Sequence, residues 1–215
     1  MMERMIGRRR KTLVFLALAG FLAGGAPAPA TEIPAFAERI VSADSGDVNG
    51  DAARDMVLLL TPDEEAGEED HGLLLYLGGK KDAGQIAPRA YYPDVVWGGL
   101  PGGAGGNRPS VEIAANGSIR LKSHNDAVGR LRWNQTLTLA WQDGKMMLTG
   151  YAYGSYDTLA EDGKSRKCEV NLQSGKGVRE VDGDEEPMTL DLGPAPLTVA
   201  DWPRFKDTGF CGFSE

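Results

Sequence analysis

The sequence predicts a mainly β fold, all-β or β-dominated α+β, in which antiparallel hairpins form one compact sheet-based domain. Residues 131–142 alternate apolar and polar side chains with a period of two. The short apolar runs 56–60 and 73–77 are followed by turn-forming residues, as buried strands are. We therefore expect about seven to nine short strands and little helix.

The N-terminus has the composition of an export signal. A basic stretch, Arg8–Lys11, precedes the apolar residues 13–22 and a small-residue cleavage site at Ala28-Pro29-Ala30. The apolar stretch is short for a membrane span, and an uncleaved anchor is the alternative. We expect a signal peptide over 1–30 and a single β-rich domain over 31–215, with an irregular tail from about residue 193. The protein is then expected to be periplasmic or secreted, with no membrane span in its mature chain.

The charge balance excludes some partners. Removal of residues 1–30 takes away five of the 23 basic residues and one of the 31 acidic residues, which moves the net charge from −8 to −12. A chain this acidic repels nucleic acid and anionic lipid. It is compatible with cation binding, although simple solubility explains most of the acidic residues.

Two cysteines, Cys168 and Cys211, lie in the predicted mature chain. An even count in an oxidising compartment favours a disulfide over a catalytic thiol. Such a bond would attach the Pro-rich C-terminal segment to the rest of the domain. The aromatic residues of that segment are expected to fill the core, and they are Trp202, Phe205, Phe210 and Phe213.

Two hairpins are predicted in the first half of the chain. The runs 56–60 and 73–77 flank an acidic stretch, 61–72, which reads as an exposed loop with a solvated His71. Further on, a three-residue loop, Ala115-Asn116-Gly117, would place Ile113 opposite Ile119 and Val111 opposite Leu121, with Gly117 left-handed.

The clearest hairpin has Asp143-Gly144 as a tight type I′ turn. Counted outward from this turn, Trp141 faces Met146, Leu139 faces Leu148 and Leu137 faces Gly150. On the opposite, wet side, Thr138 faces Thr149 and Thr136 faces Tyr151. Another hairpin is expected over residues 167–172 and 177–181, joined by Ser174-Gly175.

The stretch Asp47–Asp55 is the one candidate metal site. Side-chain oxygens stand at relative positions 1, 3, 5 and 9 of this loop, the first part of a calcium-loop spacing, in Asp47, Asn49, Asp51 and Asp55. Position 6, usually Gly, is Ala52, and a left-handed Ala costs about 1 kcal/mol. The alternative is a metal-free turn in which Asp47 accepts hydrogen bonds from the amides of Asn49 and Gly50, and Asp51 does likewise further on.

This half-loop resembles the Asp-x-Asn-x-Asp-Gly-x-x-Asp calcium loops of FG-GAP and VCBS-type repeats and of dockerins. The resemblance implies calcium as the bound ion, with Ala53 supplying a backbone carbonyl beside the four side chains. Those families repeat the loop, whereas this chain has it once, so a propeller or a dockerin is not expected.

More broadly, the order of Gly46–Asp51, Leu73–Leu77, Gly129–Trp133 and Asn171–Gly175 is similar to a group of secreted Gram-negative proteins with FG-GAP or VCBS-like loops. No activity is established for that group. The resemblance implies export and one β-rich domain.

The sequence contains no recognisable catalytic set. His124 and Asp126 form a conceivable pair, but no Ser or Cys stands in a nucleophile setting. The aromatic residues Trp97, Tyr151, Tyr153 and Tyr156 could form a strip that binds sugar or peptide, or could be partly buried. The preferred function is a calcium-stabilised binding or scaffolding domain of the cell envelope, and the alternative is a small periplasmic hydrolase.

Overall fold

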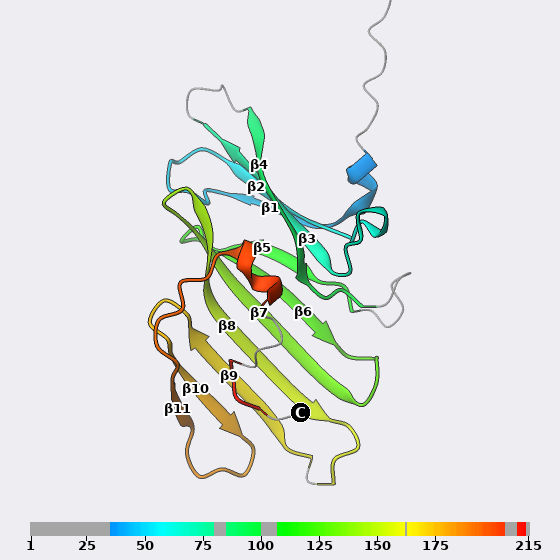
Figure 1. Ribbon diagram of the computed structural model, residues 1–215, viewed down its shortest axis with the longest axis vertical. Helices are drawn as coiled ribbons and strands as arrows, with labels where there is room; N and C mark the ends of the chain where they lie inside the picture. The colour runs from blue at the N-terminus through cyan, green and yellow to red at the C-terminus, as the bar shows by residue number, and fades with distance from the viewer. Residues whose placement is uncertain (1–34, 80–84, 100–106, 162, 205–209, 214–215) are drawn as a thin grey trace, which may run out of the picture. The chain divides into compact units, whose positions relative to one another are not determined.

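Eleven strands in two antiparallel sheets dominate the described part of the chain (Figure 1). The computed structural model describes residues 35–79, 85–99, 107–161, 163–204 and 210–213, so the predicted signal peptide lies outside the described residues. The only helices in these ranges are short 3₁₀ segments: η1 (Ala35–Arg39), η2 (Glu64–Ala66) and η3 (Val199–Arg204). The predicted mainly β fold is confirmed.

The first sheet has four strands in the order β1-β2-β3-β4. They are β1 (Ile40–Gly46), β2 (Asp55–Leu60), β3 (His71–Gly78) and β4 (Ile86–Val96). The predicted hairpin of the two apolar runs is β2 and β3, in which Val57 faces Leu75 and Leu59 faces Leu73. All four of these side chains are fully buried, as a run without polar alternation predicts.

The second sheet has seven strands, and each pairs with its neighbours in the sequence. They are β5 (Ser110–Ile113), β6 (Ile119–Asn125), β7 (Leu131–Gln142), β8 (Lys145–Asp157), β9 (Ser165–Asn171), β10 (Lys176–Val181) and β11 (Met188–Asp191). The predicted hairpin around Ser174-Gly175 is formed by β9 and β10.

Two predicted turns have the expected backbone. Gly117 is left-handed with φ of 80°, and Ile113 lies opposite Ile119. Asp143 and Gly144 both have positive φ, 49° and 78°, as a type I′ turn requires.

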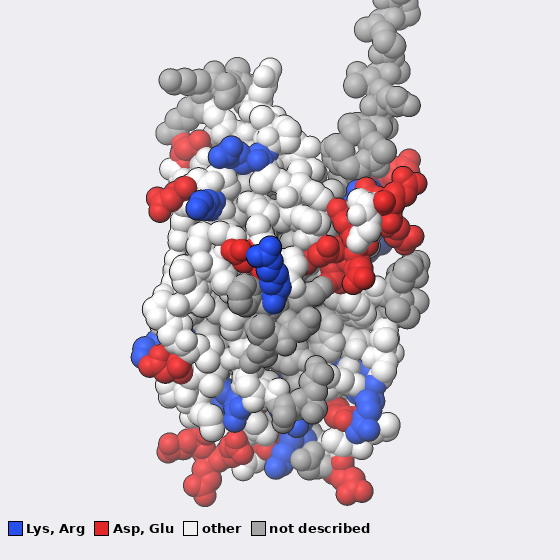
Figure 2. All heavy atoms as spheres, viewed as in Figure 1, with Lys and Arg blue, Asp and Glu red and all other residues white. Residues whose placement is uncertain are grey.

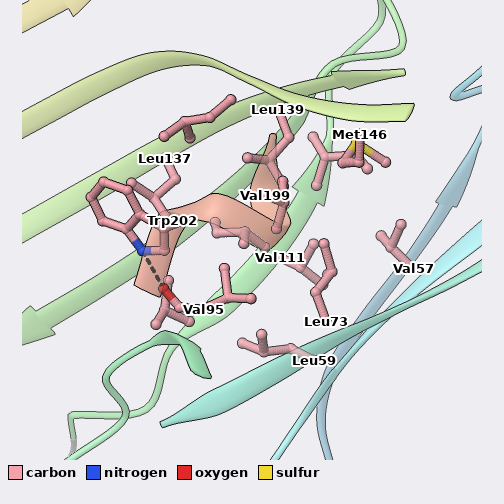
Figure 3. Close-up of a cluster of buried hydrophobic side chains, with 14 of the residues drawn as sticks. Val57, Leu59, Leu73, Val95, Val111, Leu137, Leu139, Met146, Val199 and Trp202 are labelled. Carbon is pink, nitrogen blue, oxygen red and sulfur yellow. Dashed lines mark hydrogen bonds between the residues drawn. The ribbon is translucent and has the colours of Figure 1, made fainter. Parts of the chain in front are cut away.

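The two sheets share one hydrophobic core (Figure 3). The face of the seven-stranded sheet that enters this core is called the inner face below. The helix η3 packs on β4 and β8, and its Trp202 is 1% exposed and donates from Nε1 to the carbonyl of Val95 at 2.8 Å. Of the other predicted core-filling aromatics, Phe210 and Phe213 pack against the core, and Phe205 lies outside the described residues.

The sheets meet at the edges of β1 and β5. The amide of Val111 donates to Ser42 Oγ at 3.1 Å, and the amide of Ile113 donates to Asp44 Oδ2 at 2.7 Å. Side chains of β1 thus take up hydrogen-bond donors that an edge strand would otherwise leave open. The strand β4, at the other edge of its sheet, carries Pro88 and Pro93, which disfavour pairing with a further strand.

The predicted disulfide between Cys168 and Cys211 is present and links β9 to the C-terminal segment. Arg179 of β10 reinforces this attachment, since it donates from Nη1 to the carbonyl of Gly212 at 2.9 Å and lies over the ring of Phe213. Residues 210–213 are thereby held on the inner face of the seven-stranded sheet.

The acidic stretch after β2 is organised around one arginine. Arg39 pairs with Asp63 at 2.8 Å and with Glu68 at 2.9 Å, and acidic side chains gather on this side of the molecule in Figure 2. Tyr91 donates to Glu68 at 2.8 Å, and burial together with Glu68 raises the pKa of Tyr91 to about 12.

Candidate functional site

The loop before β2 is folded around the side chain of Asp47. Asp47 Oδ1 accepts the amides of Gly50 and Asp51 at 2.7 and 3.1 Å, and its Oδ2 accepts the amide of Ala52 at 2.8 Å. The backbone of Ala52 is left-handed with φ of 64°, the conformation that usually calls for Gly at this position.

Asn49 and Asp51 lie in the same turn. Asn49 Oδ1 accepts the amide of Asp51 at 3.0 Å, which Asp47 also accepts, and Asp51 Oδ1 accepts the amide of Ala53 at 2.7 Å. The side chains of Asp47 and Asn49 therefore converge on a single N–H group. The loop thus has amide-to-carboxylate hydrogen bonds like those of the metal-free turn, with Gly50 as a predicted donor to Asp47 and with Asp51 and Ala52 in place of Asn49.

Asp55 has a different place. Its side chain is fully buried, Oδ2 accepts the amide of Val48 at 2.8 Å, and Oδ1 accepts the amide of Gly78 at 2.9 Å. Asp55 thus ties the loop to the end of β3. Within the described ranges, no three His, Cys, Asp or Glu side chains come together as a metal-binding group, and the calcium site stays a prediction.

A β-bulge in β8 overturns part of the predicted register. Trp141 faces Met146 and Leu139 faces Leu148 as predicted, but the pairing then shifts, so that Thr138 faces Gly150 and Leu137 faces Tyr151. The extra residue is Thr149, whose Oγ1 donates to the carbonyl of Thr138 and whose own carbonyl accepts the amide of Leu172. The predicted pairs Leu137–Gly150, Thr138–Thr149 and Thr136–Tyr151 are therefore wrong.

The bulge changes which face two tyrosines occupy. Because side chains alternate along a strand, one extra residue turns Tyr151 and Tyr153 from the wet face to the inner face. Leu137, which is fully buried, lies directly opposite Tyr151. Tyr156, by contrast, is 50% exposed and lies on the outer face, so the predicted four-residue strip is divided between the two faces.

A continuous row of rings results, formed by three side chains of β7 and β8 and by Trp97, which directly follows β4. Trp97 lies 5.3 Å from Trp133 between ring centroids, Trp133 lies 6.4 Å from Tyr153, and Tyr153 lies 6.4 Å from Tyr151. These four residues, called the aromatic row below, are all partly exposed. Trp133 was absent from the predicted strip because the sequence marks it as one more core-facing residue of β7.

Polar side chains lie beside the aromatic row. Ser155 is opposite Trp133 and is itself opposite Arg166, while Gln135 is opposite both Ser123 and Tyr153. Residues directly opposite in adjacent strands share a face, so these hydroxyl, amide and guanidinium groups accompany the rings. This part of the sheet lies beyond the four-stranded sheet in Figure 1, where β7, β8 and β9 continue past it.

The C-terminal segment closes one end of the row. Phe210 lies 5.5 Å from Tyr151, and Trp202 lies 5.9 Å from it. Burial, with a smaller effect of Tyr153, raises the pKa of Tyr151 far above its ordinary value. Trp202 and Phe210 therefore cover the Tyr151 end of the aromatic row, and Trp97 and Trp133 form its other end.

His124 of the candidate catalytic pair lies on the outer face of β6, opposite Asn134. His124 Nε2 and Asp126 Oδ2 are 3.6 Å apart, with Asp126 72% exposed. Such exposed pairs are common surface contacts of small energetic effect. Both cysteines are in the disulfide, so neither supplies a nucleophile.

His71 contradicts its predicted solvation. It is 8% exposed at the start of β3, and a methyl group at Gly98 would come within 1.9 Å of its Cε1 atom. Burial lowers the pKa of His71 from 6.5, an effect that Asp70 partly opposes. The acidic residues beside His71 in the sequence predict exposure. In the structure, Gly98 has no side chain, so the backbone around Gly98 packs directly against the His71 ring and buries it.

We expect the burial of His71 to make the protein less stable in mild acid. Its folded pKa lies below the unfolded value of 6.5, so its contribution is complete above pH 6.5 and is lost as the pH falls below it. Urea unfolding between pH 7.5 and 5.5 should show this fall, and His71→Gln should flatten it. His124→Gln, the matched control, should leave the slope unchanged, and a slope retained in His71→Gln would contradict the assignment.

A membrane-spanning helix is absent from the part of the chain that the structure describes. Comparison of the chain with protein-family models, with curated proteins and with solved structures gives no significant match.

Proposed function

We propose that this protein is an exported binding domain of the cell envelope that holds a sugar or a peptide on the aromatic row. The observation that carries the proposal is the row itself. Three partly exposed rings lie on the inner face of β7 and β8, and the ring of Trp97, directly after β4, continues the row. The half-buried Gln135 lies on the same face, opposite Tyr153. Ligand sites typically combine aromatic side chains with a few polar groups that fix orientation.

The bulge at Thr149 supports this function. Two tyrosines on the wet face would have left the inner face of β8 without large side chains at these positions. Bulges are enriched next to functional sites because they redirect side chains, and here the redirection completes the row.

A binding screen tests the proposal. The protein would be applied to an array of neutral and acidic oligosaccharides and to an array of random decapeptides. Trp133→Ala and Tyr153→Ala should each weaken any binding found by about tenfold or more, since each removes a large contact surface. Tyr156→Ala, on the opposite face of the same strand, is the matched control and should bind as the parent does. Equal losses in all three variants, or binding to neither array, would rule the proposal out.

The second part of the proposal is that the loop Asp47–Asp55 takes up calcium as a stabilising ion. The hard oxygen donors would be Asp47, Asn49 and Asp51, with the carbonyl of Ala53 and with Asp55 as the remaining predicted ligands. Each carboxylate oxygen has two lone pairs, so Asp47 Oδ2 and Asp51 Oδ1, which accept one amide each, can also contact a cation. The left-handed Ala52 and the convergence of Asp47 and Asn49 support a loop of this type.

Thermal melting of the oxidised protein with calcium and with EGTA tests this part. Calcium at a hundredfold excess over its dissociation constant should raise the melting temperature by roughly 5–10 °C. Asp51→Asn keeps the side-chain acceptor for the Ala53 amide but removes the negative charge, so it should reduce the calcium-dependent rise in melting temperature. Asp126→Asn, which lies outside the loop, should show the same rise as the parent protein. Identical melting temperatures in millimolar calcium and in EGTA would contradict calcium binding, and the loop would then be a metal-free turn.

A further inference from the structure

His71, the first residue of β3, has a buried ring nitrogen without a hydrogen-bond partner. The residue is 8% exposed, and its Nδ1 has no donor or acceptor opposite it within the described ranges. Buried polar atoms of this kind are rare in native proteins, and each one calls for an explanation. Protonation would make both ring nitrogens donors and would add a charge. The structure therefore accommodates the neutral ring and has no described acceptor for the protonated one at Nδ1.

The chain that buries this ring is residues 96–99, called the cover segment below. Val96 lies opposite His71 in the sheet, and a methyl group at Gly98 would collide with Cε1 and Nδ1 of the ring. Trp97 stands between these two residues in the sequence, and its ring lies 5.3 Å from that of Trp133 between centroids. The same four residues thus cover His71 and place the last ring of the aromatic row.

The cover segment begins next to a fixed point of the core. Val95 is buried, and its carbonyl accepts Trp202 Nε1 at 2.8 Å (Figure 3). The strand β4 ends at Val96, so residues 97–99 lie outside the pairing of the four-stranded sheet. Local opening requires least free energy where few ladder bonds are broken. A displacement of the cover segment would therefore leave the sheet and the Trp202 contact in place.

The charged groups around His71 do not offset the burial of its ring. Asp70 raises the pKa of His71, but burial lowers this pKa by more. The carboxylate of Asp94 accepts two backbone amides of the stretch before β3. A further polar group lies over Gly72, on the opposite face of the strand, and consists of Arg39, Glu68 and Tyr91. A proton on His71 is thus accommodated best when the ring becomes exposed.

From this geometry we propose that protonation of His71 releases the cover segment and takes Trp97 away from Trp133, so that the aromatic row is complete at neutral pH and opens in mild acid. The opening itself does not depend on a ligand. Its consequence, the loss of a bound ligand in acid, rests on the proposed function.

Proton linkage gives the size of the effect. In the open form His71 is exposed, with a pKa of about 6.5, whereas the closed form disfavours the proton. A proton that binds only the open form favours opening increasingly as the pH falls below 6.5. Between pH 7.5 and pH 5.0, the ratio of open to closed molecules should then rise by up to about thirtyfold.

Relaxation-dispersion NMR of ¹⁵N tests this inference, because it detects minor conformations that exchange in microseconds to milliseconds. The oxidised protein would be measured between pH 7.5 and 5.0, with tryptophan indole resonances assigned from Trp→Phe variants. The open population reported by the Trp97 indole and the Gly98 amide should rise as the pH falls. The Cε1–H resonance of His71 should follow the same pH dependence, and the Trp202 indole should show no such rise.

Two variants assign the effect to His71. His71→Gln cannot titrate in this range, so the population reported by Trp97 should no longer depend on pH, whereas His124→Gln should behave as the parent does. The inference is overturned by a pH-independent population in the parent or by a rise that persists in His71→Gln. An equal rise at Trp202 also overturns it, since that would be global unfolding. Opening at Trp97 together with binding to neither array overturns the proposed function alone.

Discussion

Replacement of Asp55 by Ala should lower the free energy of unfolding by roughly 3–5 kcal/mol, a large loss for a single substitution. The side chain is fully buried and accepts two amides, from Val48 in the preceding loop and from Gly78 at the end of β3. Its removal leaves two buried donors without an acceptor and separates the loop from the first sheet. Urea unfolding, followed by tryptophan fluorescence, measures the loss.

Two comparisons make the Asp55 result specific. Asp126→Ala removes an exposed carboxylate and should cost at most about 1 kcal/mol. Asp55→Asn retains one acceptor oxygen and should fall between the parent and the Ala variant. If Asp55 acts through the two amides, Asp55→Ala should lose the same unfolding free energy in EGTA as in calcium. A loss that disappears in EGTA would show instead that Asp55 acts as a calcium ligand.

Loss of the disulfide should be nearly as costly. Cys168 and Cys211 are 43 residues apart, and closing a loop of that length stabilises a fold by about 4 kcal/mol on the chain-entropy model. The double variant Cys168→Ala, Cys211→Ala should lose stability of that order. It should also free the C-terminal segment, so that protease cuts after Arg204 sooner than in the parent.

The reduced parent protein provides the control for the cysteine variant. Both sulfurs are buried, so reduction should be verified by alkylation and mass before the melt is recorded. Arg179 should hold part of the segment even without the bond, through its contacts with Gly212 and Phe213. A fully reduced protein that melts at the same temperature as the oxidised one would refute the expected contribution.

The sequence predicted those parts of the fold that depend on local chemistry. The turns at Gly117 and at Asp143-Gly144 followed from the need for positive φ, and the strands beside them paired as expected close to each turn. The apolar runs before and after the acidic stretch paired because neither contains a polar residue that could face water. The disulfide followed from the even cysteine count.

The candidate site was harder to predict because distant residues build it. The bulge at Thr149 depends on the carbonyl of Thr138 in β7 and on the amide of Leu172 after β9, and no local pattern around Thr149 marks it. His71 and Asn107 are buried by segments that include Gly98 and Gly99, whose packing the linear sequence does not reveal. The four aromatic residues of the predicted strip were therefore divided, and Trp133 took the place of Tyr156 in the row.

The order of the strands has a consequence for how the protein reaches its native state. Each of the described strands pairs with a strand adjacent to it in the sequence, and the order of the described strands contains no crossover in either sheet. Chains dominated by such near-neighbour pairings close short loops first and fold faster than β proteins with distant pairings. Each sheet can thus be extended one hairpin at a time along the chain. The contact of β1 with β5 and the linkage of Cys168 to Cys211 would follow as the late, long-range steps.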